Sequence, residues 1–165
     1  MKNNTQKGIA LYVAVIVSGI VTLLAVAMAD TAYRQIILAR ASENSQHAFY
    51  IANTGVECAL YYDAYENAFP SNEDEDEIDE GTIRCADDTD VRDIDTEVDG
   101  NSATTTFMLD GITSNPETCA IITVGKHEYT ESGSPRVGTL ILVDGRYPCE
   151  GPRSAERSIR VRYGF

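Results

Sequence analysis

From Ile9 to Ala29 the chain reads IALYVAVIVSGIVTLLAVAMA, a run of about 21 residues without a charged side chain. A helix of that length rises roughly 30 Å, which matches the thickness of a lipid hydrocarbon core. Lys2 and Lys7 precede the run, and Asp30 follows it directly. Because positive charge favours the cytoplasmic side, we expect a single-pass membrane helix with a short cytoplasmic N-terminus and all later residues outside.

The helix is expected to continue beyond the membrane, because no proline occurs before Pro70 and the residues up to about Asn67 suit a helix. We expect residues 30–67 to be amphipathic. Small side chains recur along one face of this part and would let another backbone approach closely, either the chain's own sheet or a neighbouring helix. These small residues are Ala41, Ser45, Ala48, Ala52, Gly55 and Ala59, with Phe49, Val56 and Leu60 supplying bulk beside them.

The acidic residues of the chain are concentrated after this helix. The chain has 13 basic and 26 acidic side chains, a formal net charge of −13, and most of the excess lies between Glu73 and Asp99. Such a surface repels phosphate backbones, so no nucleic-acid contact is expected. We interpret residues 68–102 as a solvated acidic loop, because the run from Glu73 to Glu77 repels itself and cannot form a core.

The region after Gly100 predicts a sheet. Four segments rich in Thr, Val and Ile, or alternating in polarity, suit strands; they are residues 103–109, 119–125, 137–143 and 158–163. In the last segment Ile159, Val161 and Tyr163 are expected to face inward, and Ser158, Arg160 and Arg162 to face water. Turns are expected at Asp110–Gly111, Ser132–Gly133 and Asp144–Gly145. The fold class predicted is α+β, a long N-terminal helix packed on a four-stranded antiparallel sheet within residues 103–165.

Four cysteines fall in the outer part of the chain, and an even number in an oxidising compartment suggests two disulfides. Zinc is the alternative, but it favours closely spaced pairs such as C-x-x-C, which this sequence lacks. Four cysteines allow three pairings. We favour Cys58 with Cys85 and Cys119 with Cys149, because each pair closes a local loop.

Neither catalysis nor a cofactor is expected. His47 lies among polar neighbours on the helix, and His127 lies at the end of a strand beside Glu128, with no G-x-S-x-G nucleophile motif. Oxygen ligands for calcium are plentiful, yet they do not follow the order of an EF-hand loop with glycine at the sixth place, so a solvated loop is preferred. These calcium candidates are Asp87, Asp88, Asp90, Asp93, Asp95 and Asp99.

The order of these parts resembles type IV pilins and the related pseudopilins, and the match is carried by the N-terminus. Lys7-Gly8-Ile9-Ala10-Leu11 is similar to a prepilin peptidase site, with residues 1–8 as the leader and residues 9–29 as the membrane segment. The sequence from Ser45 to Phe49, SQHAF, is similar to minor pilins beyond the membrane. The resemblance covers about the first 60 residues by motif, and the later residues only by architecture.

The resemblance implies a structural subunit with defined processing and partners. Prepilin peptidase would cut after Gly8, Ile9 would be N-methylated, and other pilin or pseudopilin subunits would bind through the N-terminal helix. Most major pilins carry Glu five residues after the cleavage point, whereas this chain has Val13. Since a carboxylate in lipid is costly and kept for a purpose, its absence favours a minor subunit that starts or caps a filament, in the membrane before assembly and at the cell surface after it.

Two other readings of the N-terminus stay open. Ala27-Met28-Ala29 fits the small-x-small rule of signal peptidase, and cleavage there would release a secreted protein that begins at Asp30. An apolar region of about 21 residues is long for a signal peptide, in which it is typically about 7 to 15 residues. An uncleaved signal anchor that carries an extracytoplasmic binding domain is the second alternative.

Overall fold

The computed structural model describes residues 4–72, 78, 83–85, 91–112 and 115–164. Its first element is a long helix, α1 (Asn4–Tyr61), which continues into a short π-helix, η1 (Tyr62–Glu66). The helix ends at Asn67, whose left-handed conformation stops it, and the predicted end near this residue is confirmed. The chain divides into two compact units, Met1–Arg40 and Ala41–Phe165.

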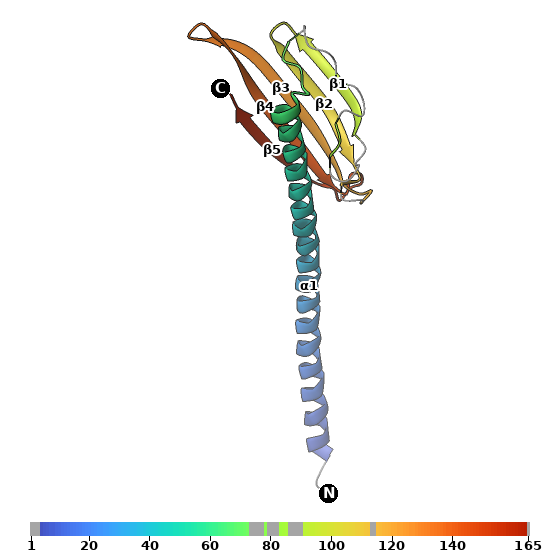
Figure 1. Cartoon of the computed structure of the whole chain (residues 1–165). Coiled ribbons are helices and arrows are strands. Elements are labelled where there is room, and N and C mark those ends of the chain that lie inside the picture. Colours follow the sequence, from blue (N-terminus) through green and yellow to red (C-terminus); the bar gives the residue numbers. More distant parts are fainter. Residues whose placement is uncertain (1–3, 73–77, 79–82, 86–90, 113–114, 165) are drawn as a thin grey trace. The chain divides into compact units, whose positions relative to one another are not determined.

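The second unit contains one antiparallel sheet in the order β1-β2-β3-β4-β5, so that each strand pairs with its neighbour in the sequence (Figure 1). The strands are β1 (Val91–Asp99), β2 (Ser102–Asp110), β3 (Cys119–Glu131), β4 (Ser134–Tyr147) and β5 (Ala155–Tyr163). Together with α1 they form the predicted α+β fold. The four predicted strands correspond to parts of β2, β3, β4 and β5.

Strand β1 lies inside the stretch that was expected to be a solvated loop, so that part of the prediction is wrong. Val91 and Ile94 of this strand pack against the hydrophobic core, while Asp95 and Glu97 are exposed. The alternation is therefore present, but acidic residues have low strand propensity and conceal it. Its place at the edge of the sheet explains the charge, because charged side chains protect an edge strand from unwanted pairing. The run Glu73 to Glu77 lies outside the described residues.

The part of α1 that belongs to the second unit covers one face of the sheet, and the two backbones approach closely. A Cβ added at Gly145 in β4 would lie 2.5 Å from the backbone N and 2.9 Å from the Cβ of Ala52 in α1. The turn predicted at Asp144–Gly145 is therefore wrong, since both residues lie within β4. Gly145 lets the helix come close to the strand. From the sequence alone, a glycine with this role cannot be distinguished from a glycine in a turn.

The inner face of the sheet and the covering helix enclose a single hydrophobic cluster. Its largest fully buried members in the sheet are Phe107, Leu109, Ile122, Val124, Ile141 and Val143. In β5 the predicted alternation is confirmed, because Ile159, Val161 and Tyr163 are half-buried against this cluster and Ser158, Arg160 and Arg162 are exposed. The predicted turn at Ser132–Gly133 is confirmed as well, since both residues have positive φ between β3 and β4.

Two disulfides tie the second unit together. Cys58 of α1 is bonded to Cys85, with Cα atoms 5.7 Å apart, and Cys119 of β3 is bonded to Cys149, with Cα atoms 5.5 Å apart. This is the pairing that local loop closure favours. The sequence separations of 27 and 30 residues correspond to about 3 to 4 kcal/mol each by loop entropy.

Candidate functional site

The apolar segment from Ile9 to Ala29 belongs to α1, which is long and apolar enough to cross a membrane. Its large side chains are exposed in every direction around the helix axis, for example Leu11 at 71% and Leu23 at 73%. An apolar surface of this extent is not stable in water and requires lipid or another protein to cover it. Gly8 lies in α1 and Ile9 is exposed, so the backbone at the expected processing site is helical.

The hydroxyl groups of this segment bond to its own backbone. Ser18 Oγ donates to the carbonyl oxygen of Val15 at 2.9 Å, and Thr22 Oγ1 donates to that of Ser18 at 2.7 Å. Just after the segment, Thr31 Oγ1 donates to the carbonyl oxygen of Ala27 at 3.0 Å. Polar groups satisfied within the helix cost little in a hydrocarbon environment, so this surface is suited to lipid on all sides.

The small-residue face of α1 is used largely inside the chain. Ala48, Ala52 and Ala59 are 0% exposed, and Gly55 is buried against Val143 and Ile122 of the sheet. Of the two predicted partners of this face, the chain's own sheet therefore takes four of the six predicted packing residues. Ala41 is exposed and Ser45 is half-buried, so the face is uncovered only at its N-terminal end.

The second half of α1 and the following η1 also carry exposed aromatic side chains. The sequence predicts that Phe49 supplies bulk to the packed face. This prediction is wrong, because Phe49 is 49% exposed. Its ring meets that of Tyr50 edge to face, and Tyr61 stacks on Tyr65 with ring centroids 5.5 Å apart. Large exposed aromatic side chains are typical of surfaces that bind another protein.

The C-terminal end of the helix is held to the sheet by a buried charge pair. Asp63 lies in η1, and its Oδ1 is 2.8 Å from Nζ of Lys126 in β3; the two side chains are 4% and 10% exposed. Within the described part of the chain, Lys126 is the only partner of this oxygen. Lys126 also donates to the carbonyl oxygen of Phe69 at 2.9 Å, so one cation fixes both the helix end and the segment that follows it.

The other oxygen of Asp63 accepts hydrogen bonds from two further strands. Thr139 Oγ1 of β4 donates to Oδ2 at 3.3 Å, and the Tyr163 hydroxyl of β5 donates to the same atom. Burial raises the pKa of Tyr163, and the hydrogen bond to Asp63 raises it further, so the hydroxyl remains a donor at any physiological pH. Because the carboxylate of Asp63 contacts three strands, it fixes the end of the helix on the sheet.

Sequence reasoning missed this cluster, although a signal for it exists. Lys126 is the only lysine after Lys7, and within β3 it directly follows an apolar stretch that is buried at alternate positions. A lone lysine at such a place indicates a buried partner, since lysine is almost never buried unless it is paired. No pattern in the sequence identifies Asp63 as that partner, because the two residues are 63 positions apart.

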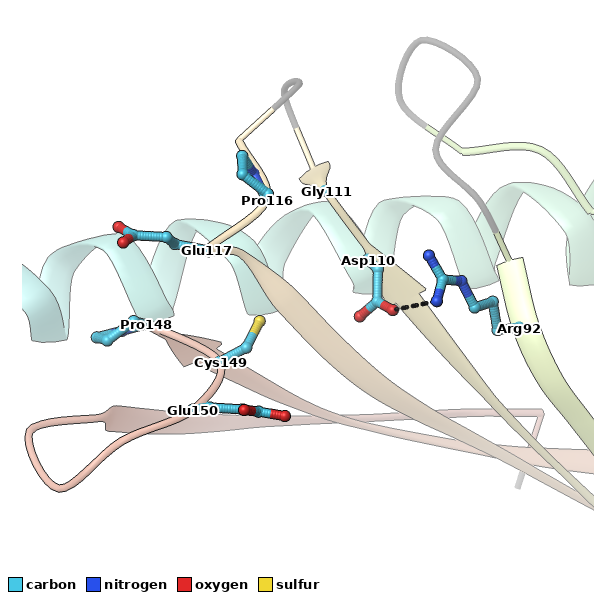
Figure 2. Close-up of a pocket in the computed structure, with 8 residues that line it drawn as sticks. All are labelled: Arg92, Asp110, Gly111, Pro116, Glu117, Pro148, Cys149 and Glu150. Atoms are coloured by element: carbon cyan, nitrogen blue, oxygen red, sulfur yellow. Dashed lines mark ion pairs between the residues drawn. The ribbon is translucent and has the colours of Figure 1, made fainter.

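A shallow cavity lies at the opposite end of the sheet, near the second disulfide. Figure 2 shows its lining residues, which come from β1, the end of β2 and the segments that follow β2 and β4. The ion pair between Arg92 and Asp110 measures 3.6 Å. Sulfur atoms of Cys119 and Cys149 lie near the carboxylate of Asp110, at a spacing that suits a metal ion. Both sulfurs are bonded to each other, however, and a disulfide sulfur is not a thiolate ligand.

The remaining candidates from the sequence are dispersed in the structure. His47 is exposed and lies beside the ring of Tyr147, with centroids 4.7 Å apart, while His127 Nδ1 is 2.7 Å from the hydroxyl oxygen of Ser102. Of the calcium candidates, Asp93, Asp95 and Asp99 are exposed on β1, and Asp87, Asp88 and Asp90 lie outside the described residues.

Comparison with known proteins finds no matching family model, no similar curated protein and no similar solved structure.

Proposed function

We propose that the chain is a structural, non-catalytic subunit of a type IV pilus or a related secretion pseudopilus. The observation that carries the proposal is the composition of α1: one continuous helix is apolar on all sides from Ile9 to Ala29, and farther on it packs one face against an antiparallel sheet. A helix of this kind can be stored in a membrane and later exchange lipid for other helices in a filament core.

The sequence at the start of this helix supports the same proposal. Lys7 and Gly8 precede the apolar segment directly, as at a prepilin peptidase site. The helix is unbroken at Ala29 and Asp30, where a secreted protein would need to be cut. The exposed ion pair between Asp30 and Arg34, at 3.1 Å, is a contact within the helix at that point, so the residues there are in regular helical structure.

Within this proposal the subunit has a minor role, at the start or the tip of the filament. Val13 takes the place of the carboxylate that would meet the N-terminal amine of a neighbour, and it is 50% exposed on the helix surface. Without that carboxylate, addition of one copy after another lacks an electrostatic contact in lipid, where such a contact is strong. The subunit is then present in far fewer copies than the major pilin.

The deciding experiment is the mass of the N-terminal peptide of the full chain isolated from its own cell. A mature chain that begins at Ile9 and carries one extra methyl group is expected. A Gly8→Val variant should keep the leader, because the peptidase is expected to require glycine there. The matched control is Gly19→Val, since a Cβ at Gly19 would meet nothing within 4 Å and the helix should tolerate it.

The two alternatives give different masses in the same experiment. An N-terminus at Asp30 would contradict the proposal and support a secreted protein. An intact leader in the wild type, with Gly8→Val indistinguishable from it, would contradict the proposal and support a signal-anchored binding domain. The exposed aromatic side chains Phe49, Tyr50, Tyr61 and Tyr65 would then be the first candidates for its binding surface.

A further inference from the structure

The Cys119–Cys149 disulfide lies beside a carboxylate that the sheet places next to it. Asp110, the last residue of β2, is the direct cross-strand partner of Cys119, the first residue of β3. One carboxylate oxygen of Asp110 and the two sulfur atoms all lie within 4.8 Å of one another. Among the residues that the structure describes, no other His, Cys, Asp or Glu side chains form such a group, so the Cys58–Cys85 disulfide has no comparable neighbour there.

Backbone hydrogen bonds hold these three residues together without help from the disulfide. Cys119 is paired on both sides, with Asp110 of β2 and with Arg146 of β4. The backbone N–H of Cys149 donates to the carbonyl oxygen of Glu117 at 2.9 Å, and this contact holds the segment after β4 beside the start of β3. When the disulfide is open, the two thiols and the carboxylate should therefore stay near one another.

Every chain is made with its cysteines as thiols, and disulfides form afterwards. We propose that in this dithiol form Cys119, Cys149 and Asp110 bind one zinc ion, and that closure of the disulfide releases it. Two thiolates and one carboxylate are ligands that zinc accepts, with water in the fourth position. Calcium and magnesium prefer sites made of oxygen alone, so the sulfur atoms favour zinc. The inference goes beyond the proposed function and does not depend on it.

The spacing of the ligand atoms suits a single ion. Zinc binds sulfur at about 2.3 Å and oxygen at about 2.0 to 2.2 Å, so the ligand atoms of a tetrahedral site lie about 3.5 to 4 Å apart. The Cα atoms of Cys119 and Cys149 are 5.5 Å apart, and rotation about the Cα–Cβ bonds can bring the free sulfur atoms to this spacing. A zinc ion between them would then link β3 to the segment after β4, as the disulfide does.

The surroundings of the cluster admit a cation. The cavity of about 490 Å³ in Figure 2 opens beside Cys149 and is also lined by Glu117 and Glu150, whose exposed carboxylates attract positive ions. Arg92 lies 3.6 Å from one oxygen of Asp110, and this ion pair is partly exposed. Because a carboxylate has two oxygens, Arg92 leaves one of them for zinc and orients the group, as outer partners of metal ligands do.

The release of zinc is an exchange in which atoms and electrons balance. Zinc binding first displaces one proton from each thiol into solution. On oxidation the two thiolates give up two electrons and form the S–S bond, while a disulfide of a thiol–disulfide oxidoreductase accepts these electrons and two protons from solution to become a dithiol. Zinc leaves as Zn²⁺, because the sulfur atoms of a disulfide are no longer thiolate ligands. The zinc site and the disulfide are therefore alternative states of the same two sulfur atoms.

The test uses the full chain in an uncharged detergent, reduced with a phosphine and then freed of the phosphine without oxygen. One zinc ion per chain is expected to remain after gel filtration. Zinc should slow the alkylation of Cys119 and Cys149 by roughly tenfold or more, because a metal-bound thiolate is not free to react. Alkylation of Cys58 and Cys85, followed in the same mass spectra, should not change. Oxidised glutathione should release the zinc as the Cys119–Cys149 bond forms.

A variant of the carboxylate separates a built site from casual binding to thiols. Asp110→Asn should bind zinc more weakly than the wild type by roughly tenfold or more, since even the outer partners of a metal ligand are worth that much. The matched control is Asp99→Asn, which makes the same change in charge at an exposed residue at the far end of β1 from Arg92. It should bind zinc like the wild type. Thermal melting of the oxidised forms should show that both variants fold.

Three results would each overturn the zinc site. The first is a reduced wild type that retains no zinc, whether it stays folded or unfolds and does not refold when zinc is added. The second is protection of all four cysteines to the same degree, and the third is Asp110→Asn binding zinc as tightly as the wild type. None of these results bears on processing at Gly8, so the zinc site and the proposed function can fail separately.

Discussion

Both halves of α1 carry apolar side chains on the same regular helix, but only those of the second half are covered by another part of the chain. From Ile9 to Ala29 the large apolar side chains are exposed, whereas Ala48, Ala52 and Ala59 are 0% exposed because the sheet covers them. Hydrophobic burial in the second half stabilises the domain itself. Burial in the first half has to come from outside the chain, which is the property that the proposed filament subunit requires.

The second half should be most sensitive at the buried ion pair that holds its end. Lys126→Met leaves the carboxylate of Asp63 buried without the cation that pairs with it, and we expect the free energy of unfolding to fall by about 3 to 5 kcal/mol. Urea denaturation of the full chain in detergent, followed through tyrosine near-UV circular dichroism, measures it. The double variant Lys126→Met with Asp63→Leu removes both charges and should recover most of the loss; no recovery would contradict a charge effect.

The first half should respond to charge in a way that the second half does not. Ile20 and Phe49 are similarly exposed, at 54% and 49%, but only Ile20 is expected to face lipid. Ile20→Arg should weaken membrane partition by about 3 kcal/mol, or roughly a hundredfold, because arginine at the centre of a membrane helix is unfavourable. Phe49→Arg is the matched control and should partition like the wild type in a flotation assay with vesicles. Equal behaviour of the two variants would contradict the membrane assignment.

Glycines in the two halves of the fold give a smaller contrast. Gly145→Ala forces a Cβ to within 2.5 Å of the backbone N of Ala52, and we expect a loss of about 1 to 3 kcal/mol as the helix moves off the sheet. Gly19→Ala meets no atom within 4 Å and should leave the unfolding of the domain unchanged. Thermal melting of both variants in the same detergent compares them directly. Equal melting temperatures would show that the helix does not need glycine at position 145.

The sequence predicts the fold well where its signals are local. The length of the helix, its end at Asn67 and the alternation in β5 all follow from neighbouring residues, and the disulfide pairing follows from short loops. The strand β1 and the role of Gly145 could not be predicted, because acidic composition and a Gly signal each favour a loop when the opposing element is unknown. For a contact between distant positions such as Asp63 with Lys126, the lone lysine indicates a buried partner, but no local pattern identifies which residue that partner is.

The segment that leaves the helix offers the smallest and most selective test, because one carboxylate of β3 holds it. Ser71 Oγ and Asn72 Nδ2 each donate to Glu128 Oε1 at 2.7 Å, and these two hydrogen bonds hold the pKa of Glu128 below its ordinary value. Since the folded-state pKa is the lower one, Glu128 stabilises the fold above its unfolded-state pKa of about 4.3 and loses that contribution as the pH falls through the folded-state pKa.

Glu128→Gln should therefore melt a little below the wild type at about pH 7, and the gap should close on acidification to about pH 3. Thr130→Val is the matched control, because Thr130 is an exposed, non-titrating neighbour on the same strand. Its melting difference from the wild type should not depend on pH. A gap between Glu128→Gln and the wild type that stays constant across the same range would mean that the charge of Glu128 does not hold Ser71 and Asn72. The hydrogen bond from Lys126 to Phe69 would still attach this segment.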